Sequence, residues 1–139
     1  MRMETLPIRL KPGQDLRRAI EEAATDKGCR AAFVLAGIGS LAQAQIRLAG
    51  TDEPRLVCGN LEVVALSGTI ASDASHLHAA LATASGDVLG GHVAYGCIVG
   101  TTAEVLLALL PVWHFTRELD LATGYDELIV RQISEHDST

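Results

Sequence analysis

The chain has little cysteine, no excess of basic residues and no long apolar stretch. Its 139 residues include three cysteines, and no two of them form a Cys-x-x-Cys pair. An odd set of cysteines without such a pair argues against a disulfide framework and against a cysteine-ligated zinc site. We expect Cys29, Cys58 and Cys97 to be buried thiols, because a free cysteine usually behaves as a small apolar side chain.

Basic residues are outnumbered by acidic ones. Eleven Lys and Arg stand against seventeen Asp and Glu, which gives a formal net charge of −6 at pH 7 with histidine neutral. A negative chain is not attracted non-specifically to phosphate backbones or to anionic lipid. The composition therefore excludes a basic coat for nucleic acid.

Membrane-spanning and secretory segments are also missing from the sequence. The longest apolar runs, at 31–37 and 105–110, are far shorter than the roughly 20 residues of a membrane span. The N-terminal residues lack the apolar region and the small-residue cleavage site of a secretory signal. We therefore expect a cytoplasmic protein that does not contact a membrane.

The remaining composition is that of a globular domain. Apolar residues make up 48% of the chain and charged residues 20%, which is an ordinary balance for one soluble domain. We expect a single domain over residues 1–139, with a core at about 6–130 and a frayed polar tail at 134–139. A domain of this length needs no structural metal to form a core, so a bound metal would be functional.

One amphipathic helix is expected near the N-terminus. Apolar residues recur at positions 16, 19, 20, 23 and 24, a spacing that forms one stripe on a helix. Gln14 or Asp15 offers an N-cap acceptor, and Gly28 follows Lys27 where a left-handed residue commonly ends a helix.

Most of the other segments predict antiparallel strands. Alternating or apolar patterns, separated by turn residues, occur at 6–10, 42–48, 61–70, 77–82, 88–99, 115–117 and 127–130. Residues 77–82 and 88–99 flank a turn at 85–87, as the two arms of a hairpin do. The segment 101–110 fits a helical stripe as well as a buried strand.

A further apolar run at 29–36 ends in the sequence Gly-Ile-Gly-Ser at 37–40. We expect a strand buried on both faces, closed by a tight turn at the two glycines. The motif resembles a phosphate-binding loop, but it lacks the Gly-x-Gly-x-x-Gly spacing and leads into a strand where such a loop needs a helix N-terminus. No nucleotide cofactor is expected.

Three histidines are candidates for a metal site. His76 and His78 stand two residues apart, so on a strand they share a face, about 6.6 Å apart along the chain. A three-residue loop at 84–86 places His92 opposite His78, whereas a two-residue turn at 85–86 places it on the other face unless a bulge at Gly90-Gly91 restores it. Three imidazoles with an open fourth position suit zinc, and also iron, nickel or copper.

The alternative is that these histidines are surface or subunit-interface residues without a ligand. Glu104, Arg117 and Tyr125 are polar residues among apolar neighbours, either in a pocket or in an ion pair at an interface. Glu104 is the first candidate for a base beside a metal, and Arg117 for holding an anionic ligand. His114 and His136 are expected to have no role.

The order of several short motifs resembles that of a known family, the plants and prokaryotes conserved (PPC) domain. The resemblance runs from about residue 6 to residue 130. It rests on Leu-Lys-Pro-Gly at 10–13, Gly-Ile-Gly-Ser-Leu at 37–41, Leu-Ser-Gly-Thr-Ile at 66–70, His-Leu-His at 76–78, Gly-Gly-His at 90–92, Thr-Thr-Ala-Glu-Val at 101–105, Phe-Thr-Arg-Glu at 115–118 and Gly-Tyr at 124–125.

The resemblance implies an α/β (α+β) fold, predominantly antiparallel sheet with few helices, assembled as a homotrimer. It favours a strand for residues 101–110. It also implies a metal or small-ligand site at His76, His78 and His92 near a subunit boundary.

The resemblance further implies a protein associated with DNA. Plant members join this domain to AT-hook motifs that read the minor groove, and prokaryotic single-domain members are assigned to DNA binding by that association. This chain has no Arg-Gly-Arg-Pro hook. Residues 59–66 match only in part the motif through which the plant proteins contact their partners. Asn60 replaces an Arg and Leu61 a Phe, so partner specificity does not carry over.

Two functions therefore follow from the sequence. The first is a trimeric PPC protein in DNA-associated regulation, with DNA or a DNA-associated protein as partner and a histidine site for a divalent metal, zinc first. The alternative is a metal-dependent enzyme or small-ligand sensor that uses His76, His78 and His92. A purely structural trimer with silent histidines is a third possibility.

Overall fold

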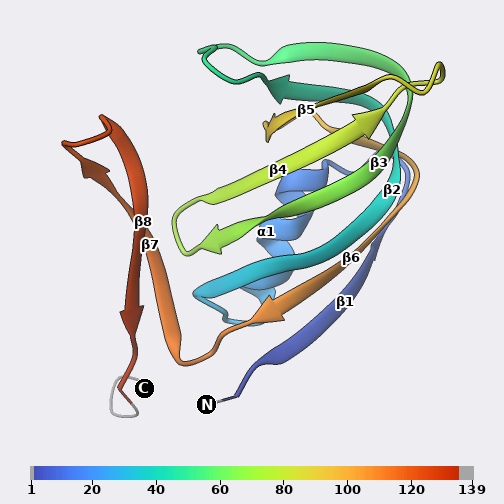
Figure 1. Cartoon of the computed structure of the whole chain (residues 1–139). Coiled ribbons are helices and arrows are strands. Elements are labelled where there is room, and N and C mark those ends of the chain that lie inside the picture. Colours follow the sequence, from blue (N-terminus) through green and yellow to red (C-terminus); the bar gives the residue numbers. More distant parts are fainter. Residues whose placement is uncertain (1, 135–139) are drawn as a thin grey trace.

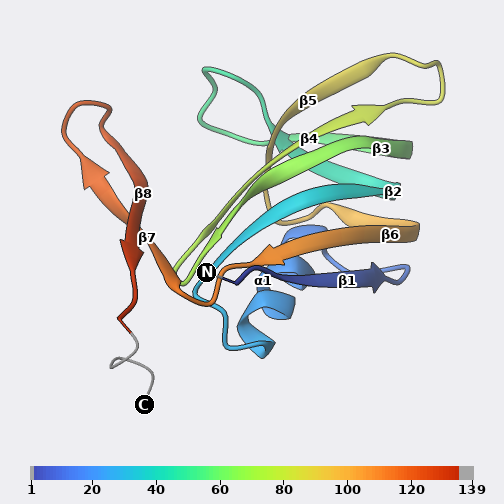
Figure 2. The ribbon, with the colours of Figure 1, turned by 60° about the horizontal axis from the view of Figure 1, so that its bottom comes forward.

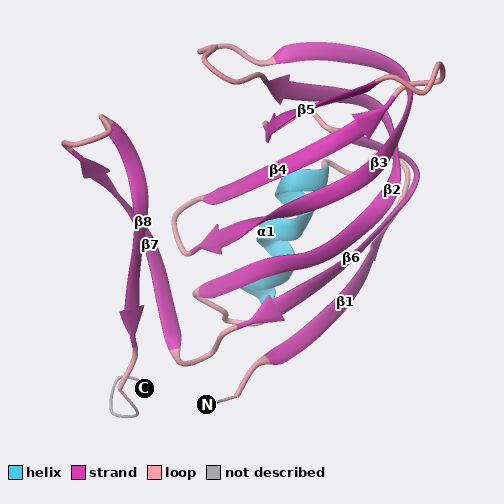
Figure 3. Cartoon of the chain, viewed as in Figure 1, coloured by secondary structure: helices cyan, strands magenta, loops and turns pink. Residues whose placement is uncertain are grey.

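The computed structural model describes residues 2–134, so His136 and nearly all of the tail expected at 134–139 lie outside the described residues. Eight strands and one helix follow in the order β1 (Glu4–Leu10), α1 (Leu16–Asp26), β2 (Ala31–Arg47), β3 (Arg55–Ala71), β4 (Ser75–Ala82), β5 (Val88–Val93), β6 (Ile98–Leu109), β7 (Trp113–Asp120) and β8 (Tyr125–Gln132). Figure 3 shows how strongly strands predominate.

Six strands form one antiparallel sheet in the order β1-β6-β2-β3-β4-β5. The far end of β2 also pairs with β5, through Ile46 with Val93 and Arg47 with His92. Strands β2 to β5 are thus joined in a closed series of pairings at this end. The predicted α+β class with a mainly antiparallel sheet is confirmed, and residues 101–110 form a strand within β6.

Helix α1 covers one face of this sheet (Figures 1 and 2). Its buried stripe is Leu16, Ala19, Ile20 and Ala24, and it packs into one core with residues of all six strands. Asp15 is the N-cap and accepts a hydrogen bond from the Arg18 amide at 3.0 Å, while Gly28 adopts a φ of 66°. The predicted helix and both of its ends are confirmed. We call α1 and strands β1 to β6 the sheet body.

Strands β7 and β8 pair only with each other among the described residues and stand away from the large sheet in Figure 1. We call this two-stranded hairpin the arm. A small second cluster joins it to the sheet body, in which the buried residues are Ala31, Ala71 and Phe115. The Phe115 ring meets the Phe33 ring edge to face, with 5.8 Å between centroids.

The predicted turn at residues 37–40 is wrong, because β2 runs through it without interruption. The two glycines have a different purpose. A Cβ on Gly39 would lie 2.3 Å from the Thr102 carbonyl oxygen, and one on Gly37 would lie 2.7 Å from the Leu66 side chain. Glycine is therefore required for close packing inside the sheet, as it often is where backbones approach closely.

Burial of the first half of β2 on both faces is also wrong. Phe33, Leu35 and Ile38 are exposed, while the intervening Val34 is buried. Alternate residues of a strand point to opposite faces, and a register shift between Val34 and Ala36 brings Ile38 to the same face as Phe33. Only one face of the sheet is covered by α1 (Figure 2). An apolar patch is left on the other face.

Two further expectations need correction. Of the three cysteines only Cys97 is buried; Cys29 is half-buried and Cys58 is exposed. Cys58 lies opposite Gln43, and the neighbouring Val57, not Cys58, is the residue that packs against the core. The expected strand at 88–99 is divided, since β5 ends at Val93 and β6 starts at Ile98.

No helix within residues 2–134 has the length and apolar character that crossing a membrane requires.

Candidate metal centre

The β4–β5 hairpin brings the three histidines together. Ala82 pairs with Val88 and His78 with His92, without a register shift between them. The turn is closed by hydrogen bonds between Thr83 and Asp87 and between Gly86 and Thr83. This is the register of the three-residue loop at 84–86, so His92 stands beside His78 and no bulge at the two glycines is needed.

The imidazoles are close enough to share one ion. Their candidate ligand nitrogens all lie within 4.8 Å of one another, and the Nε2 atoms of His76 and His78 are 3.1 Å apart. Nitrogens bound to one tetrahedral zinc at 2.0–2.1 Å are separated by about 3.3 Å. A hydrogen bond between His76 and His78 would also account for their distance. It would not account for the position of the third ring, His92.

The protonation of the rings suits metal binding. Burial lowers the pKa of His92 to about 4, helped by the positive charge of Arg47. Burial, together with His78 and Arg117, also lowers the pKa of His76. Neutral imidazole is the form that coordinates a metal. The donor set therefore fits a divalent transition metal.

Packing around the cluster holds the histidines in place. A Cβ on Gly68 would lie 2.1 Å from the His76 carbonyl oxygen, and one on Gly91 would lie 2.4 Å from the Arg47 carbonyl oxygen. These glycines let β3 and β2 approach the strands that carry the histidines. Between His76 and His78, Leu77 points the opposite way and is buried in the core.

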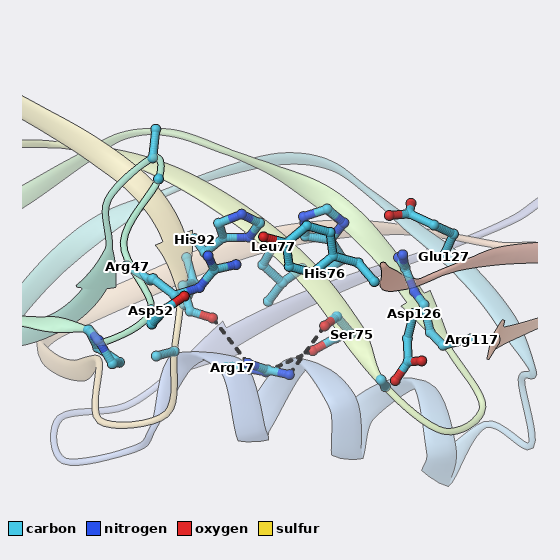
Figure 4. A pocket seen from close by; sticks show the side chains of 17 residues that line it. Arg17, Arg47, Asp52, Ser75, His76, Leu77, His92, Arg117, Asp126 and Glu127 are labelled. Carbon is cyan, nitrogen blue, oxygen red and sulfur yellow. Dashed lines mark hydrogen bonds between the residues drawn. The ribbon is translucent and has the colours of Figure 1, made fainter. Parts of the chain in front are cut away.

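A cavity of about 720 Å³ adjoins the cluster and is lined by His76 and His92 (Figure 4). It lies where β5 leaves β4 to pair with β2, so the sheet opens between them. Arg17 of α1 bridges this opening: its guanidinium donates to the Ser75 side chain and carbonyl and to the Val93 carbonyl, at 3.1, 3.2 and 3.3 Å. His78 lines a small adjacent pocket beside Ser67 and Thr69.

The other predicted site residues are separated by the fold. Arg117 and Tyr125, both on the arm, line the cavity. Glu104 lies exposed on β6, which β2 and β3 separate from β4, and it is not part of the cavity lining. Within the described residues Glu104 and Arg117 form no ion pair. His114 bonds to the Ser72 hydroxyl at 3.0 Å.

Sequence reasoning missed several residues of the cavity. Arg47, Asp52, Asp126 and Glu127 line it, but each stands in a segment that showed only a strand or loop pattern. Arg17 was not a predicted site residue either. It lies 3.8 Å from Glu21 on the same helix and also reaches into the cavity.

Comparison with known proteins identifies the family. The model of the Plants and Prokaryotes Conserved (PCC) domain matches residues 1–111. The chain belongs to the PCC family. The match covers the sheet body with its three histidines and ends before the arm.

Solved structures share this PCC fold. A hypothetical protein from Salmonella cholerae-suis has 34% identity and a TM-score of 0.91, over 94% of this chain and 95% of that one. A protein from Archaeoglobus fulgidus described as metal-containing has 27% identity and a TM-score of 0.77, over 91% and 93%. A candidate DNA-binding protein from Ralstonia eutropha JMP134, at 22% identity, TM-score 0.77 and 90% of each chain, shows the fold alone.

A longer curated protein contains a segment similar to this chain. Bifunctional protein GlmU of Synechococcus sp. (strain JA-3-3Ab) is 44% identical over 133 residues, which is 96% of this chain and 21% of the relative. The chain thus spans about a fifth of that curated relative.

Proposed function

We propose that this PCC domain is a metal-dependent ligand-binding module in which His76, His78 and His92 hold one divalent transition metal. The observation that carries the proposal is the convergence of three imidazoles, with their ligand nitrogens within 4.8 Å of one another, at the edge of a cavity. The metal-containing Archaeoglobus protein, with the same fold at 27% identity, supports it.

Zinc is the first choice of metal. Zinc accepts three histidines with a fourth position left for water or ligand, and it imposes no geometric demand from d-electrons. When bound, such an ion polarises an oxygen ligand and lowers the pKa of bound water. The chain itself contributes the donor nitrogens, the glycine-dependent packing that fixes them, and the cavity through which a ligand arrives.

A binding or sensing role is favoured over catalysis. The expected base Glu104 lies elsewhere, and among residues 2–134 no carboxylate, including Asp52, Asp126 and Glu127 of the cavity, hydrogen-bonds to any of the three histidines. A module that reports a ligand to a longer chain is also compatible with the place of the domain inside the Synechococcus protein.

Zinc titration of metal-stripped protein against a chromophoric chelator tests the metal site. We expect about one zinc per chain and at least a hundredfold weaker binding for His78→Ala, because two remaining imidazoles chelate poorly. His114→Ala, which removes an imidazole outside the cluster, should bind as the parent does. Equal zinc affinity in parent and His78→Ala would remove the proposal.

We also propose that the domain assembles as a homotrimer, with other copies covering the apolar patch on β2 and β3. Ile38 is 59% exposed and Val64 54%, next to the Gly39–Val63 pair of neighbouring strands. Exposed apolar side chains that cluster on one sheet face commonly form subunit contacts. The family resemblance supplies the stoichiometry of three.

Light scattering with size-exclusion chromatography tests this assembly. The parent should have three times the mass of one chain, and Ile38→Asp should reduce it, because a charge in the contact cannot be desolvated cheaply. Val88→Asp, at an equally exposed valine on the β4–β5 hairpin, is the matched control and should leave the mass unchanged. A monomeric parent would refute the trimer.

A second candidate function is association with DNA or a DNA-associated protein. The family resemblance implies it, and a protein from Ralstonia eutropha with the same fold is described as a candidate DNA-binding protein. The net charge of −6 opposes it, because negative charge repels the phosphate backbone. A mobility-shift assay with duplex DNA at low salt tests this second function. Retention that weakens as salt rises would favour DNA association, and the absence of any shift would remove direct DNA binding.

A further inference from the structure

Three arginines converge on the cavity from different elements: Arg17 from α1, Arg47 from the end of β2 and Arg117 from the arm (Figure 4). Arg17 is committed to the structure, because its guanidinium donates to two backbone carbonyls and one hydroxyl. It also stacks on Tyr95, with 4.4 Å to the ring centroid. The arginines with capacity for a ligand are therefore Arg47 and Arg117.

Within residues 2–134, each of these two arginine side chains donates one hydrogen bond. Arg47 donates to the Thr51 carbonyl at 3.1 Å, and Arg117 donates to the Thr69 hydroxyl at 2.9 Å. Neither guanidinium has a carboxylate oxygen within 4.0 Å among residues 2–134. A guanidinium has five N–H donors, so most of the donors on both remain for a ligand.

The two arginines are positioned beside the histidines by the sheet. Arg47 is the cross-strand partner of His92. Arg117 is tied to Thr69, which is the cross-strand partner of His76. The cavity therefore has an arginine on each side of the candidate metal ligands, one from the sheet body and one from the arm.

We propose that this cavity binds a small molecule through one oxyanion group, a carboxylate or a phosphate, which lies between Arg47 and Arg117 and is held by both as their long side chains turn toward it. The planar fork of arginine matches both groups with two parallel hydrogen bonds. The volume of about 720 Å³ lies within the roughly 300–1,000 Å³ of small-molecule sites. The inference also rests on the proposed metal function, because the metal would bind the same ligand at a second point.

The acidic residues of the cavity narrow the class of ligand. Asp52, Asp126 and Glu127 also line it, and they repel additional negative charge. A molecule with a single oxyanion end satisfies the two arginines without placing charge against these carboxylates. Nucleic acid and other polyphosphates are disfavoured at this site.

Isothermal titration of inorganic phosphate and of propionate into the full chain tests the inference, with the protein both zinc-loaded and metal-free. We expect one of the two probes to bind the zinc-loaded protein, and its identity distinguishes a phosphate from a carboxylate site. Arg47→Gln and Arg117→Gln should each weaken binding at least about tenfold, because each removes charge-assisted hydrogen bonds. Arg55→Gln, at an exposed arginine outside the cavity, should bind as the parent does.

A retained zinc stoichiometry shows that a variant is folded. Arg47→Lys gives a second check: it keeps the positive charge but loses the planar guanidinium, so it should bind the probe with intermediate affinity. Binding of neither probe to either form, or equal binding by the glutamine variants, overturns the inference. If the chain takes up no zinc but still binds a probe in an arginine-dependent way, the proposed metal function fails and the oxyanion site stands.

Discussion

The sheet body and the arm are both antiparallel strands, yet they are stabilised differently. The body buries residues of all its six strands and α1 in one continuous core, whereas the arm has a small cluster around Phe115. The arm also exposes large apolar side chains, among them Leu119, Leu121 and Tyr125. The body thus holds the histidines on its core, while the arm, which carries Arg117, is joined to the body by this small cluster and by hydrogen bonds such as that from the Arg117 amide to Asp73.

The largest expected difference is in the stability lost when a leucine is truncated in the sheet body or in the arm. Leu81 of β4 is fully buried, while Leu119 of the arm is 61% exposed. Leu81→Ala should lower the free energy of unfolding by about 2–5 kcal/mol, because it leaves a cavity in a packed core. Leu119→Ala should change it by less than about 0.5 kcal/mol. Urea unfolding followed by circular dichroism measures both, and equal losses would contradict the contrast.

Local unfolding should also occur more readily in the arm than in the sheet body. Because few buried apolar contacts join the arm to the body, the amides of β7 and β8 should exchange about a hundredfold faster than those of β2 and β3, equivalent to about 2.8 kcal/mol. Native-state hydrogen exchange read by mass spectrometry gives the comparison. Equal protection in the two regions would mean that the arm and the body open as one unit.

Charged contacts should also contribute differently to the free energy of unfolding in the sheet body and in the arm. The Asp15 carboxylate caps α1 and accepts from the Gly96 amide at 2.7 Å, so Asp15→Ala should cost about 1–2 kcal/mol. On the arm, Glu118 and Arg131 form an exposed ion pair at 3.0 Å, and Glu118→Gln should cost less than about 1 kcal/mol. Thermal unfolding of both variants checks the order; a larger loss for Glu118→Gln would reverse it.

The smallest expected effect is a difference in thiol reactivity within the sheet body. Burial raises the pKa of the Cys97 thiol to about 11, so less than about 1% of it is ionised at pH 8. Iodoacetamide at pH 8 should modify the exposed Cys58 and leave Cys97 intact, and modification of Cys97 should increase as the pH approaches 11. Mass spectrometry of peptides, with urea-unfolded protein as the control, detects this. Rapid native labelling of Cys97 would place it outside the core.

Much of the fold follows from local patterns in the sequence. The helix stripe, its cap at Asp15 and the alternating strands each depend on residues close in the chain. The histidine cluster was predictable in part, because one hairpin carries all three rings. The sequence left two loop lengths open for it, and the structure has the three-residue loop that pairs His78 with His92.

The rest depends on contacts between distant segments. The glycines at 37 and 39 face β3 and β6, a requirement that no local pattern reveals, so they were mistaken for a turn. Arg47 and Arg117 meet the histidines only because β2 pairs with β5 and because the arm returns toward β3. The exposure of Cys58 likewise depends on which face of β3 is covered, because Leu61 and Val57 face the core and Cys58 lies on the opposite face.

Metal analysis of protein purified without a tag and without added metal tests the central claim most directly. We expect about one transition-metal ion per chain by mass spectrometry, and loss of that ion in the variant His76→Ala, His78→Ala, His92→Ala with the oligomeric state retained. The same metal content in parent and triple variant, or no ion in the parent even after zinc, nickel or iron is offered, would contradict the account.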